Sequence, residues 1–318
     1  MGESGVRFLE IGDSDAGQRL DNFLLRILKG VPRSHIYKIL RSGEVRINRG
    51  RAQARYHLQQ GDIVRVPPVR QAESSPEAGI PEGVRGELFK RVLYEDARVL
   101  VLDKPSGMAV HGGSGVSWGV IEALRQLRPD LRELELVHRL DRETSGCLLL
   151  SKRRSALRSL HAAIREGEMD KHYLVLACGR WKGEMRRVDL ALRKNTLQSG
   201  ERMVRPDPET GKPSVTRFFP QQRFSGETLL RAELETGRTH QIRVHLQAIG
   251  HPVAGDAKYG DSACNSRLRQ HGLRRLFLHA SFLGFPHPAD GRIIRVEAPL
   301  PADLAGVVKA LEQEGRTG

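Results

Sequence analysis

Cysteine is scarce in this sequence of 318 residues, where it occurs at Cys147, Cys178 and Cys264. The number is odd, the three residues lie far apart, and their spacing matches no metal-binding pattern. We therefore expect no disulfide framework, which would fit a reducing compartment such as the cytoplasm.

Long apolar stretches are also missing. No run approaches the ~18 consecutive apolar residues that a membrane-spanning helix needs. The N-terminal segment has no apolar core of the kind found in secretory signals, and Val6 stands where a myristoylation motif has Ser or Thr. We expect neither a membrane association nor a secretory signal.

Acidic residues are outnumbered, with 38 Asp and Glu against 52 Lys and Arg, so the formal net charge is +14. A positive field favours polyanionic partners, and without a membrane segment nucleic acid becomes the first candidate. Between residues 19 and 66, eleven Lys and Arg face three acidic residues, a net charge of +8. This density suits phosphate contacts, although a solvated helix face is the alternative.

The same basic region has its own apolar pattern, so residues 18–66 are predicted to form a compact unit after an irregular leader at 1–17. A helix is predicted from Leu20, Phe23, Leu24, Ile27 and Leu28, and a second helix from Ile36, Ile39 and Leu40. Ser34 is the expected N-cap of the second helix, which Gly43 should end. Short strands are predicted around Val45–Ile47 and Ile63–Val66.

Residues 67–88 contain four prolines among Ser, Glu and Gly, a composition typical of a linker. From about residue 89 the pattern predicts an α+β body. Its expected strands include Val99–Leu102, Cys147–Leu150 and Tyr173–Leu176, and its expected helices are 118–128, 154–166 and 303–313.

The segment from His138 to Gly146, HRLDRETSG, is a polar loop that leads into an apolar strand, a common place for catalytic groups. Asp141 is flanked by Arg139 and Arg142, whose charge favours an ionised carboxylate. A surface ion pair is the alternative interpretation. A kinase catalytic loop is excluded because Leu140 separates Arg from Asp and no Asp-Phe-Gly follows.

Two further patterns do not indicate cofactor sites. The glycine-rich HGGSG at 111–115 lacks the Gly-Lys-Ser/Thr of a P-loop. His240 and His245 are five residues apart, which does not place them on one helical face as a metal pair requires. We expect no metal and no small-molecule cofactor.

The basic unit resembles the S4 RNA-binding domain. That family has two short helices, then a G-x-V-x-V-N-G segment and a late GD-x-V strand. Here the matching pieces are Gly43–Asn48 and Gly61–Val64, with the usual Gly after Asn displaced to Gly50. The resemblance implies binding of structured RNA by shape and backbone contacts. The expected RNA-binding residues are Arg33, Lys38, Arg41, Arg46, Arg49 and Arg51.

The body resembles the RluA-type pseudouridine synthase family. Four motifs occur in the family's order: KPSG at 104–107, the HGGSG loop, HRLDRETSG with Glu143 where Asp is frequent, and GRTHQIRVH at 237–245. Lys171-His172-Tyr173, at the start of an apolar strand, matches as well. The resemblance runs from about residue 18 to about 300.

This resemblance implies an isomerase that cleaves the uridine N1–C1′ bond and rejoins the base through C5, acting on large-subunit ribosomal RNA in the cytoplasm. It implies that Asp141 is the catalytic residue, as nucleophile at C1′ or as base at a sugar proton. It also implies that Tyr173 stacks on the base and helps to deprotonate C5, and that Arg243 pairs with Asp141. Arg139 would support the site or intercalate near the flipped uridine. Arg238 is an alternative for the role of Arg243.

The expected architecture is an α+β protein, which we expect to be a monomer. An S4-like domain of two helices and short strands at 18–80, with its linker at 67–88, precedes a catalytic domain at 89–318. That domain should contain a mixed, mostly antiparallel sheet with flanking helices. Two other functions compete: an RNA-binding or ribosome-assembly factor without catalysis, and an enzyme of another class such as a phosphotransferase or nuclease.

Overall fold

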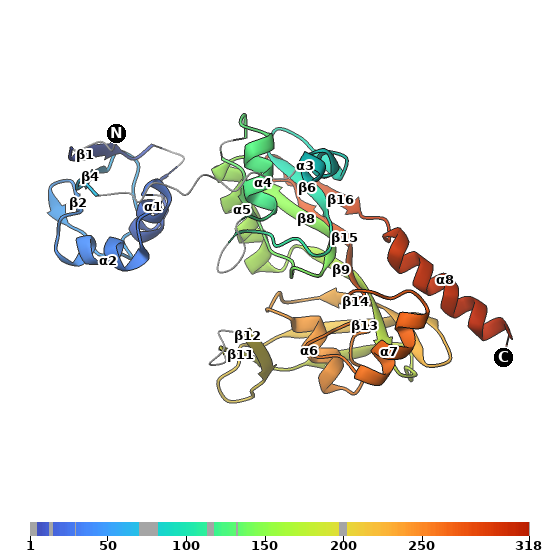
Figure 1. Ribbon diagram of the computed structural model, residues 1–318. Helices are drawn as coiled ribbons and strands as arrows, with labels where there is room; N and C mark the ends of the chain where they lie inside the picture. Colours follow the sequence, from blue (N-terminus) through green and yellow to red (C-terminus); the bar gives the residue numbers. More distant parts are fainter. Residues whose placement is uncertain are drawn as a thin grey trace. The chain divides into compact units, whose positions relative to one another are not determined.

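The computed structural model describes residues 5–12, 15–28, 30–69, 82–112, 118–131, 133–196 and 202–317. The chain divides into two compact units, Met1–Gly79 (unit 1) and Ile80–Gly318 (unit 2). Each unit has a hydrophobic core of its own, and Figure 1 labels the elements of both. The α+β class expected from the sequence is confirmed. Residues 70–81, the middle of the predicted linker, lie outside the described residues.

Unit 1 packs two helices against one face of a small antiparallel sheet with the strand order β1-β4-β2-β3. The inward residues of α1 and α2, such as Phe23 and Ile36, join Val64 and Val66 in one core cluster. The elements are β1 (Arg7–Glu10), α1 (Leu20–Ile27), α2 (Arg33–Arg41), β2 (Arg46–Ile47), β3 (Gly50–Arg51) and β4 (Ile63–Val66).

Two local predictions for unit 1 were wrong. The leader is not irregular throughout, because residues 7–10 form β1, which pairs with β4 along its whole length. Ser34 is not the N-cap of α2: Pro32 occupies that position, and its carbonyl accepts hydrogen bonds from the N–H groups of His35 and Ile36. Proline is tolerated here because its fixed φ fits the observed backbone, with φ −57° and ψ 140°, and the helix needs no N–H from this residue.

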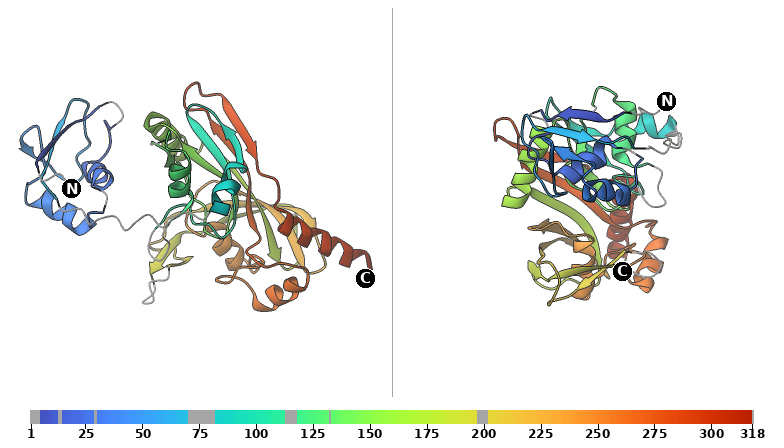
Figure 2. Two further views of the ribbon diagram at one scale, coloured as in Figure 1. Left: turned by 45° about the horizontal axis from the view of Figure 1, so that its top comes forward. Right: turned by 90° about the vertical axis from the view of Figure 1, so that its left-hand side faces the viewer.

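Unit 2 is built on a mixed sheet with the strand order β10-β13-β14-β9-β15-β8-β6-β5, to which β16 and β7 add at β15 and β8. Its pairs are antiparallel except that of β15 with β8. The hairpin of β15 and β16 is seen in orange to red in Figure 2.

The strands of unit 2 are β5 (Val92–Glu95), β6 (Val99–Lys104), β7 (Glu135–Leu136), β8 (Ser145–Ser151), β9 (Asp170–Cys178), β10 (Arg186–Asp189), β11 (Leu192–Thr196), β12 (Arg202–Pro206), β13 (Val215–Arg223), β14 (Glu227–Leu234), β15 (Leu278–Pro286) and β16 (Ile293–Glu297). Its helices are α3 (Glu82–Phe89), α4 (Val120–Leu127), α5 (Arg154–Glu166), α6 (Gln241–Ala248), α7 (Ser262–Gln270) and α8 (Ala302–Thr317).

Helix α3 begins inside the segment 67–88 that the sequence analysis assigned to the linker. Its residue Leu88 is 1% exposed and belongs to the core of unit 2. Proline and glycine density did not predict the point where the next unit begins to bury an apolar side chain.

Both faces of the sheet are covered because its central strands carry apolar side chains in both directions. On β6, Leu100 and Leu102 pack in the cluster that contains α4, whereas Val99 and Val101 pack in the cluster that contains Leu160 of α5. Strand β9 alternates in the same way between the cluster of α6 and that of α7 and α8. Helices α4 and α6 therefore share one face of the sheet.

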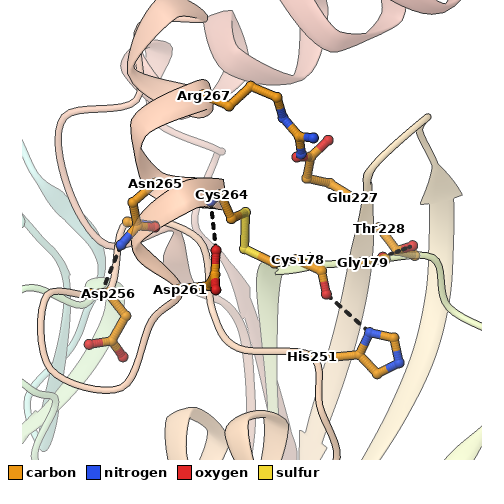
Figure 3. The surroundings of a disulfide bond; sticks show 11 residues. Cys178, Gly179, Glu227, Thr228, His251, Asp256, Asp261, Cys264, Asn265 and Arg267 are labelled. Atoms are coloured by element: carbon orange, nitrogen blue, oxygen red, sulfur yellow. Dashed lines mark hydrogen bonds and ion pairs between the residues drawn. A yellow bond between two sulfur atoms is a disulfide. The ribbon is translucent and has the colours of Figure 1, made fainter.

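Cys178 and Cys264 form a disulfide, so the expectation that cysteine pairs are absent was wrong. Cys178 is the last residue of β9 and Cys264 lies in the first turn of α7, and their Cα atoms are 6.4 Å apart although 86 positions separate them in sequence. Figure 3 shows the bond between the strand and the helix. The separation in sequence could not show that these two cysteines are close, because the fold places the start of α7 next to the end of β9.

The cysteine arrangement predicts a distinct alkylation pattern. Protein purified without reductant and unfolded in guanidinium should take up one iodoacetamide adduct, at Cys147, because the other two thiols are joined. After reduction with dithiothreitol it should take up three. Peptide mass spectrometry reads the result, and three adducts before reduction would show that the bond does not form.

Candidate active site

The loop between β7 and β8 carries Asp141 and is fixed at both ends. The Nε2 atom of His138 accepts a hydrogen bond of 3.0 Å from the N–H of Leu149 on β8. Burial lowers the pKa of His138 to about 4, so its ring stays neutral and can serve as this acceptor. The N–H of Thr144 donates to the carbonyl of Asp141 at 3.2 Å, which closes the loop into a turn.

Lys104, of the KPSG segment, also holds this loop. The Nζ atom of this fully buried side chain donates to three backbone carbonyls, those of Pro105, Met108 and Arg142, at 2.8, 2.9 and 3.0 Å. Burial lowers the pKa of Lys104 to about 7, opposed by the charges of Glu143 and Asp141. The three acceptors match the three protons of an ammonium group and stabilise its charged form.

Gly107 and Arg142 complete this attachment. The N–H of Gly107 donates to the carbonyl of Arg142 at 2.9 Å, and the Nε of Arg142 donates to the carbonyl of Gly107 at 2.8 Å. The KPSG segment, which the sequence matched only by resemblance, is thus a clamp on the loop of Asp141. The HGGSG loop, the other early motif, lies largely outside the described residues.

Gly146, at the end of the same motif, allows β8 to approach β15. Its φ of +106° favours glycine, and a Cβ atom at this position would collide with the backbone of Ala280. The parallel register of His279 with Ser145 and of Ala280 with Gly146 depends on this contact. Glycine at this position therefore fixes the strand on which the loop of Asp141 ends.

The GRTHQIRVH segment forms a turn and the start of α6. His240, with a φ of +53°, precedes the helix. The buried side chain of Gln241 has four hydrogen-bond partners, namely the N–H of Arg238, the carbonyl of Val215 and the hydroxyls of Thr236 and Thr216. This network fixes the turn, and with it the direction in which Arg243 leaves the helix.

Arg243 joins two carboxylates. Its Nη1 donates to Oδ2 of Asp141 at 3.2 Å, while Nε and Nη2 donate to Oδ2 and Oδ1 of Asp256 at 2.6 and 2.8 Å. Its guanidinium carbon also lies 5.0 Å from the centre of the Tyr259 ring. Burial alone would lower the pKa of Arg243, but the hydrogen bonds and charge of Asp256 and Asp141 raise it. The guanidinium is therefore a fixed cation beside Asp141.

Asp256 was not anticipated from the sequence. Its side chain is fully buried, and Oδ1 also accepts hydrogen bonds from the N–H groups of Lys258 and Tyr259 at 2.8 and 3.0 Å. Burial would raise the pKa of Asp256, but Arg243 and these N–H groups lower it. In the sequence, Asp256 is only an acid between Gly255 and Ala257 that follows an apolar pair. This pattern is too common to identify Asp256 as a site residue.

Asn265 of α7 holds the loop of Asp256. Its Oδ1 accepts from the N–H of Gly255 at 2.7 Å, and its Nδ2 donates to the carbonyl of Asp256 at 3.1 Å, as Figure 3 shows for the second contact. The adjacent residue in α7 is Cys264, which is bonded to Cys178. The position of Asp256 is therefore tied to the end of β9.

A pocket forms where these segments meet on the α6 side of the sheet. Its walls include Asp141, whose side chain is 22% exposed, together with Tyr173, Arg139 and Arg243. The structure thus brings together the four site residues expected in the body. The other lining residues are Leu140, Thr144, Leu234, Gly237, Arg238, Thr239, His240, Gln241, Ile242 and Leu278.

Several groups in the pocket are oriented by hydrogen bonds. Arg139 donates through Nη2 to the hydroxyl of Thr239 at 2.6 Å. The Nδ1 atom of His240 lies 2.9 Å from the hydroxyl of Tyr259, and its Nε2 lies 3.8 Å from Oδ2 of Asp141. Burial raises the pKa of Tyr173, and the charge of Asp141 adds to the effect. Tyr173 is therefore a neutral phenol at ordinary pH.

Arg238, the alternative partner of Asp141, has a different contact: its Nε donates to the carbonyl of Pro213 at 3.1 Å. Arg238 nevertheless lines the pocket, whereas His245 does not. The Nε2 atom of His245 lies 2.8 Å from the hydroxyl of the buried Ser214. In the part of the chain that the structure describes, no group of three or more His, Cys, Asp or Glu is placed to hold a metal ion.

The six residues expected to bind RNA belong to unit 1, and none of them lines the pocket. All six side chains are exposed: Arg33, Lys38, Arg41, Arg46, Arg49 and Arg51. Two acids of the unit point inward instead. Asp21 accepts hydrogen bonds from Arg19 and Tyr37, and Asp62 accepts them from Asn48, Tyr56 and the N–H of Gln59. Within the described part of the chain, neither of these two acids pairs with one of the six exposed cations. Among the described helices, none has the length and apolar character to cross a membrane.

Comparison with known proteins finds a matching family for each of the two parts of the chain. Residues 98–248 match the family model of RNA pseudouridylate synthases, and residues 18–64 match that of S4 domains. A human protein, RNA Pseudouridylate Synthase Domain Containing 4, shares the fold with a TM-score of 0.60 and 23% identity, over 72% of this chain and 96% of its own.

Closer relatives span nearly the whole chain. The ribosomal large subunit pseudouridine synthase C of Pasteurella multocida is 54% identical over 311 residues, 97% of this chain and 95% of the relative. The protein of the same name from Escherichia coli K12 is 54% identical over 309 residues, 96% of this chain and 97% of the relative. Identity of this extent, with both family models matched in order, shows that the chain is an isomerase of the RNA pseudouridylate synthase family and carries an S4 domain.

Proposed function

We propose that this enzyme converts specific uridines to pseudouridine in large-subunit ribosomal RNA, with Asp141 as the catalytic carboxylate. The observation that carries the proposal is the position of Asp141: its carboxylate opens into the pocket and is held by the buried Arg243. The names of the relatives supply the substrate class. We further propose that the protein acts in the cytoplasm as a monomer, without a metal or a small-molecule cofactor.

The reaction needs the target uridine to leave its stack, at a cost of about a few kcal/mol. Once the uridine is in the pocket, Asp141 acts on the sugar by one of two routes: attack on C1′, or removal of a sugar proton to give a glycal. Either route breaks the N1–C1′ bond, after which the base turns and bonds to C1′ through C5. Formation of the C5–C1′ bond breaks the bond between Asp141 and C1′ on the first route, or is accompanied by return of the sugar proton on the second. The C5 proton is then lost and N1 takes up a proton, so that the product is an isomer of uridine.

The neighbours of Asp141 have separate roles in this proposal. Arg243 pairs with the carboxylate and orients it, since its own position is set by Asp256. Tyr173 provides an aromatic surface for the freed base. Its raised pKa favours stacking and hydrogen-bond donation over a role as phenolate base at C5. Arg139, fixed by Thr239 at the rim, supports the extruded nucleotide.

We also propose the division of labour expected from the sequence: an RNA-binding domain at 18–80 and a catalytic domain at 89–318. The outward cations of unit 1 support the first part, and the separate core of unit 2 supports the second. Because α3 contributes Leu88 to that core, the catalytic domain should include residues 82–88 as well.

Asp141→Asn should reduce isomerisation to below a few per cent of wild type while RNA affinity stays nearly unchanged, because the amide keeps the shape but loses the reactive charge. The assay is tritium release from ribosomal RNA that carries 5-tritiated uridine, with EDTA present and no nucleotide added. Glu143→Gln, at an exposed carboxylate in the same loop, is the matched control and should remain active. Activity of Asp141→Asn above a few per cent would contradict the assignment.

Arg243→Ala should lower the rate at saturating RNA steeply with a modest loss of affinity. It leaves Asp256 buried without its partner, which costs roughly 3–5 kcal/mol of stability, so thermal unfolding is measured alongside. Arg243→Lys, which keeps the charge but cannot form the paired hydrogen bonds to Asp256, should be folded and still slow. Arg238→Ala is the control. If Arg243→Lys weakened binding and left the saturated rate intact, Arg243 would be a phosphate-binding residue.

A protein that begins at Ile80 should fold and still form pseudouridine, but bind RNA more weakly and choose its sites less strictly. For each phosphate that unit 1 binds in the full-length protein, its removal should reduce the slope of log affinity against log salt by about 0.7–0.9. A full-length chain with Arg33, Lys38 and Arg41 changed to Gln should shift the slope in the same direction. Equal slopes together with equal site choice, from pseudouridine mapping, would show that unit 1 is not the RNA anchor.

A further inference from the structure

The sheet of unit 1 presents one line of side chains to solvent. Phe8 pairs with Arg65, Arg65 with Arg46, and Arg46 with Arg51, so these four residues lie in register across the strands β1, β4, β2 and β3. Their neighbours in sequence on the same strands, such as Val64 and Ile47, point into the core. We call the surface formed by Phe8, Arg46, Arg49, Arg51, Ile63 and Arg65 the outer sheet face.

Two apolar side chains are exposed to solvent at one end of this face. Phe8 is 66% exposed and Ile63, diagonal to it on the adjacent strand, is 48% exposed. Both line a groove together with Ser42, Gly43, Glu44, Arg46, Asn48, Arg49 and Arg65. An aromatic and an aliphatic side chain that share a groove with arginines indicate a ligand with both a flat apolar part and negative charge.

Among the described residues, no acid forms an ion pair with the arginines of the face, which are held in place by other contacts. Arg65 donates through Nη1 to the carbonyl of Glu44 at 2.6 Å, and Arg46 donates through Nε to the carbonyl of Gly43 at 3.2 Å. Arg51 lies against Gly43 so closely that a Cβ atom there would be 2.7 Å from its Nε. Carbonyl acceptors fix the guanidinium groups but leave their charge available to an anion.

Arg49 adds a cation at the tip of the turn between β2 and β3. Its φ is +69°, a conformation that glycine adopts easily and arginine seldom does. The preceding Asn48 stabilises the turn, because its side chain donates to Asp62 at 2.8 Å and accepts from the N–H of Ile63 at 2.9 Å. The turn thus keeps a charged side chain at the groove at some conformational cost.

We propose that the outer sheet face binds a single-stranded segment of the RNA substrate. An unpaired base stacks on Phe8 beside Ile63, and the backbone phosphates lie on Arg46, Arg49 and Arg65. Duplex RNA hides its base faces, so an exposed aromatic ring serves only an unstacked base. The net charge of +8 between residues 19 and 66 favours RNA over a protein partner. The proposal rests on the proposed function for its substrate, and β1 lies outside residues 18–64, the part that matches the S4 model.

The test compares full-length variants by fluorescence anisotropy with a single-stranded ribosomal RNA oligonucleotide over a range of salt concentrations. Phe8→Ala should bind about 5- to 150-fold more weakly, equivalent to about 1–3 kcal/mol for one stacked base, with an unchanged salt slope. Phe8→Trp should restore the affinity. Arg46→Gln and Arg65→Gln should each reduce the slope by about 0.7. Ile293→Ala, which removes a similarly exposed apolar side chain from unit 2, should bind like wild type.

Affinity of Phe8→Ala within twofold of wild type, or failure of Phe8→Trp to recover it, would overturn the proposal. So would a loss that appears only with assembling subunits and not with free RNA, since the face would then contact a protein. Because binding is read by anisotropy and isomerisation by tritium release, the two proposals can fail separately: wild type that binds this RNA but releases no tritium contradicts the proposed function alone.

Discussion

One buried guanidinium group organises the site of this protein. Arg243 has three donor positions directed at two carboxylates, and Asp256 occupies two of them. The third is left for Asp141, so the orientation of this carboxylate follows from the ion pair of Arg243 with Asp256. A buried charge without a partner is costly, and this arrangement satisfies both acids with a single cation. Displacement of Arg243 would therefore remove a hydrogen-bond partner from Asp141 and from Asp256 at the same time.

The two units use charged residues in opposite ways. In unit 2 the important charges are buried and paired, as with Arg243 and Asp256, and their energy depends on geometry. In unit 1 the six cations expected to bind RNA face solvent, while Asp21 and Asp62 are buried and Asp21 pairs with Arg19. The division of labour that we propose would thus place long-range attraction and local chemistry in different parts of one chain.

Much of the site could be predicted from the sequence because its main residues lie in compact motifs. Asp141 and Arg243 were both recognisable from their immediate neighbours, although 102 positions separate them. Asp256 was not, because its role is set by a contact with α7 and by two N–H groups of its own loop, none of which leaves a pattern in sequence. Lys104 was matched as part of a motif, but its three carbonyl partners come from chain segments that only the fold brings together.

For the fold too, the sequence predicted some elements and missed others. Apolar periodicity predicted α5 at its observed bounds and the strands at the centre of the sheet, where packing and pattern agree. It did not predict β1, a strand of four residues whose partner lies more than fifty positions away. It also extended the linker into α3, whose residue Leu88 is buried in the core of unit 2.

The bond between Cys178 and Cys264 closes the chain into a covalent ring that contains Arg243 and Asp256 but not Asp141 or Tyr173. A protease that cuts once anywhere inside the ring therefore produces two chain ends without releasing a fragment. The cation would stay tethered to the strand that carries the aromatic residue, and the nicked molecule would separate into pieces only when a thiol reagent opened the ring. Resistance to fragmentation in this protein is thus a matter of topology as well as of packing.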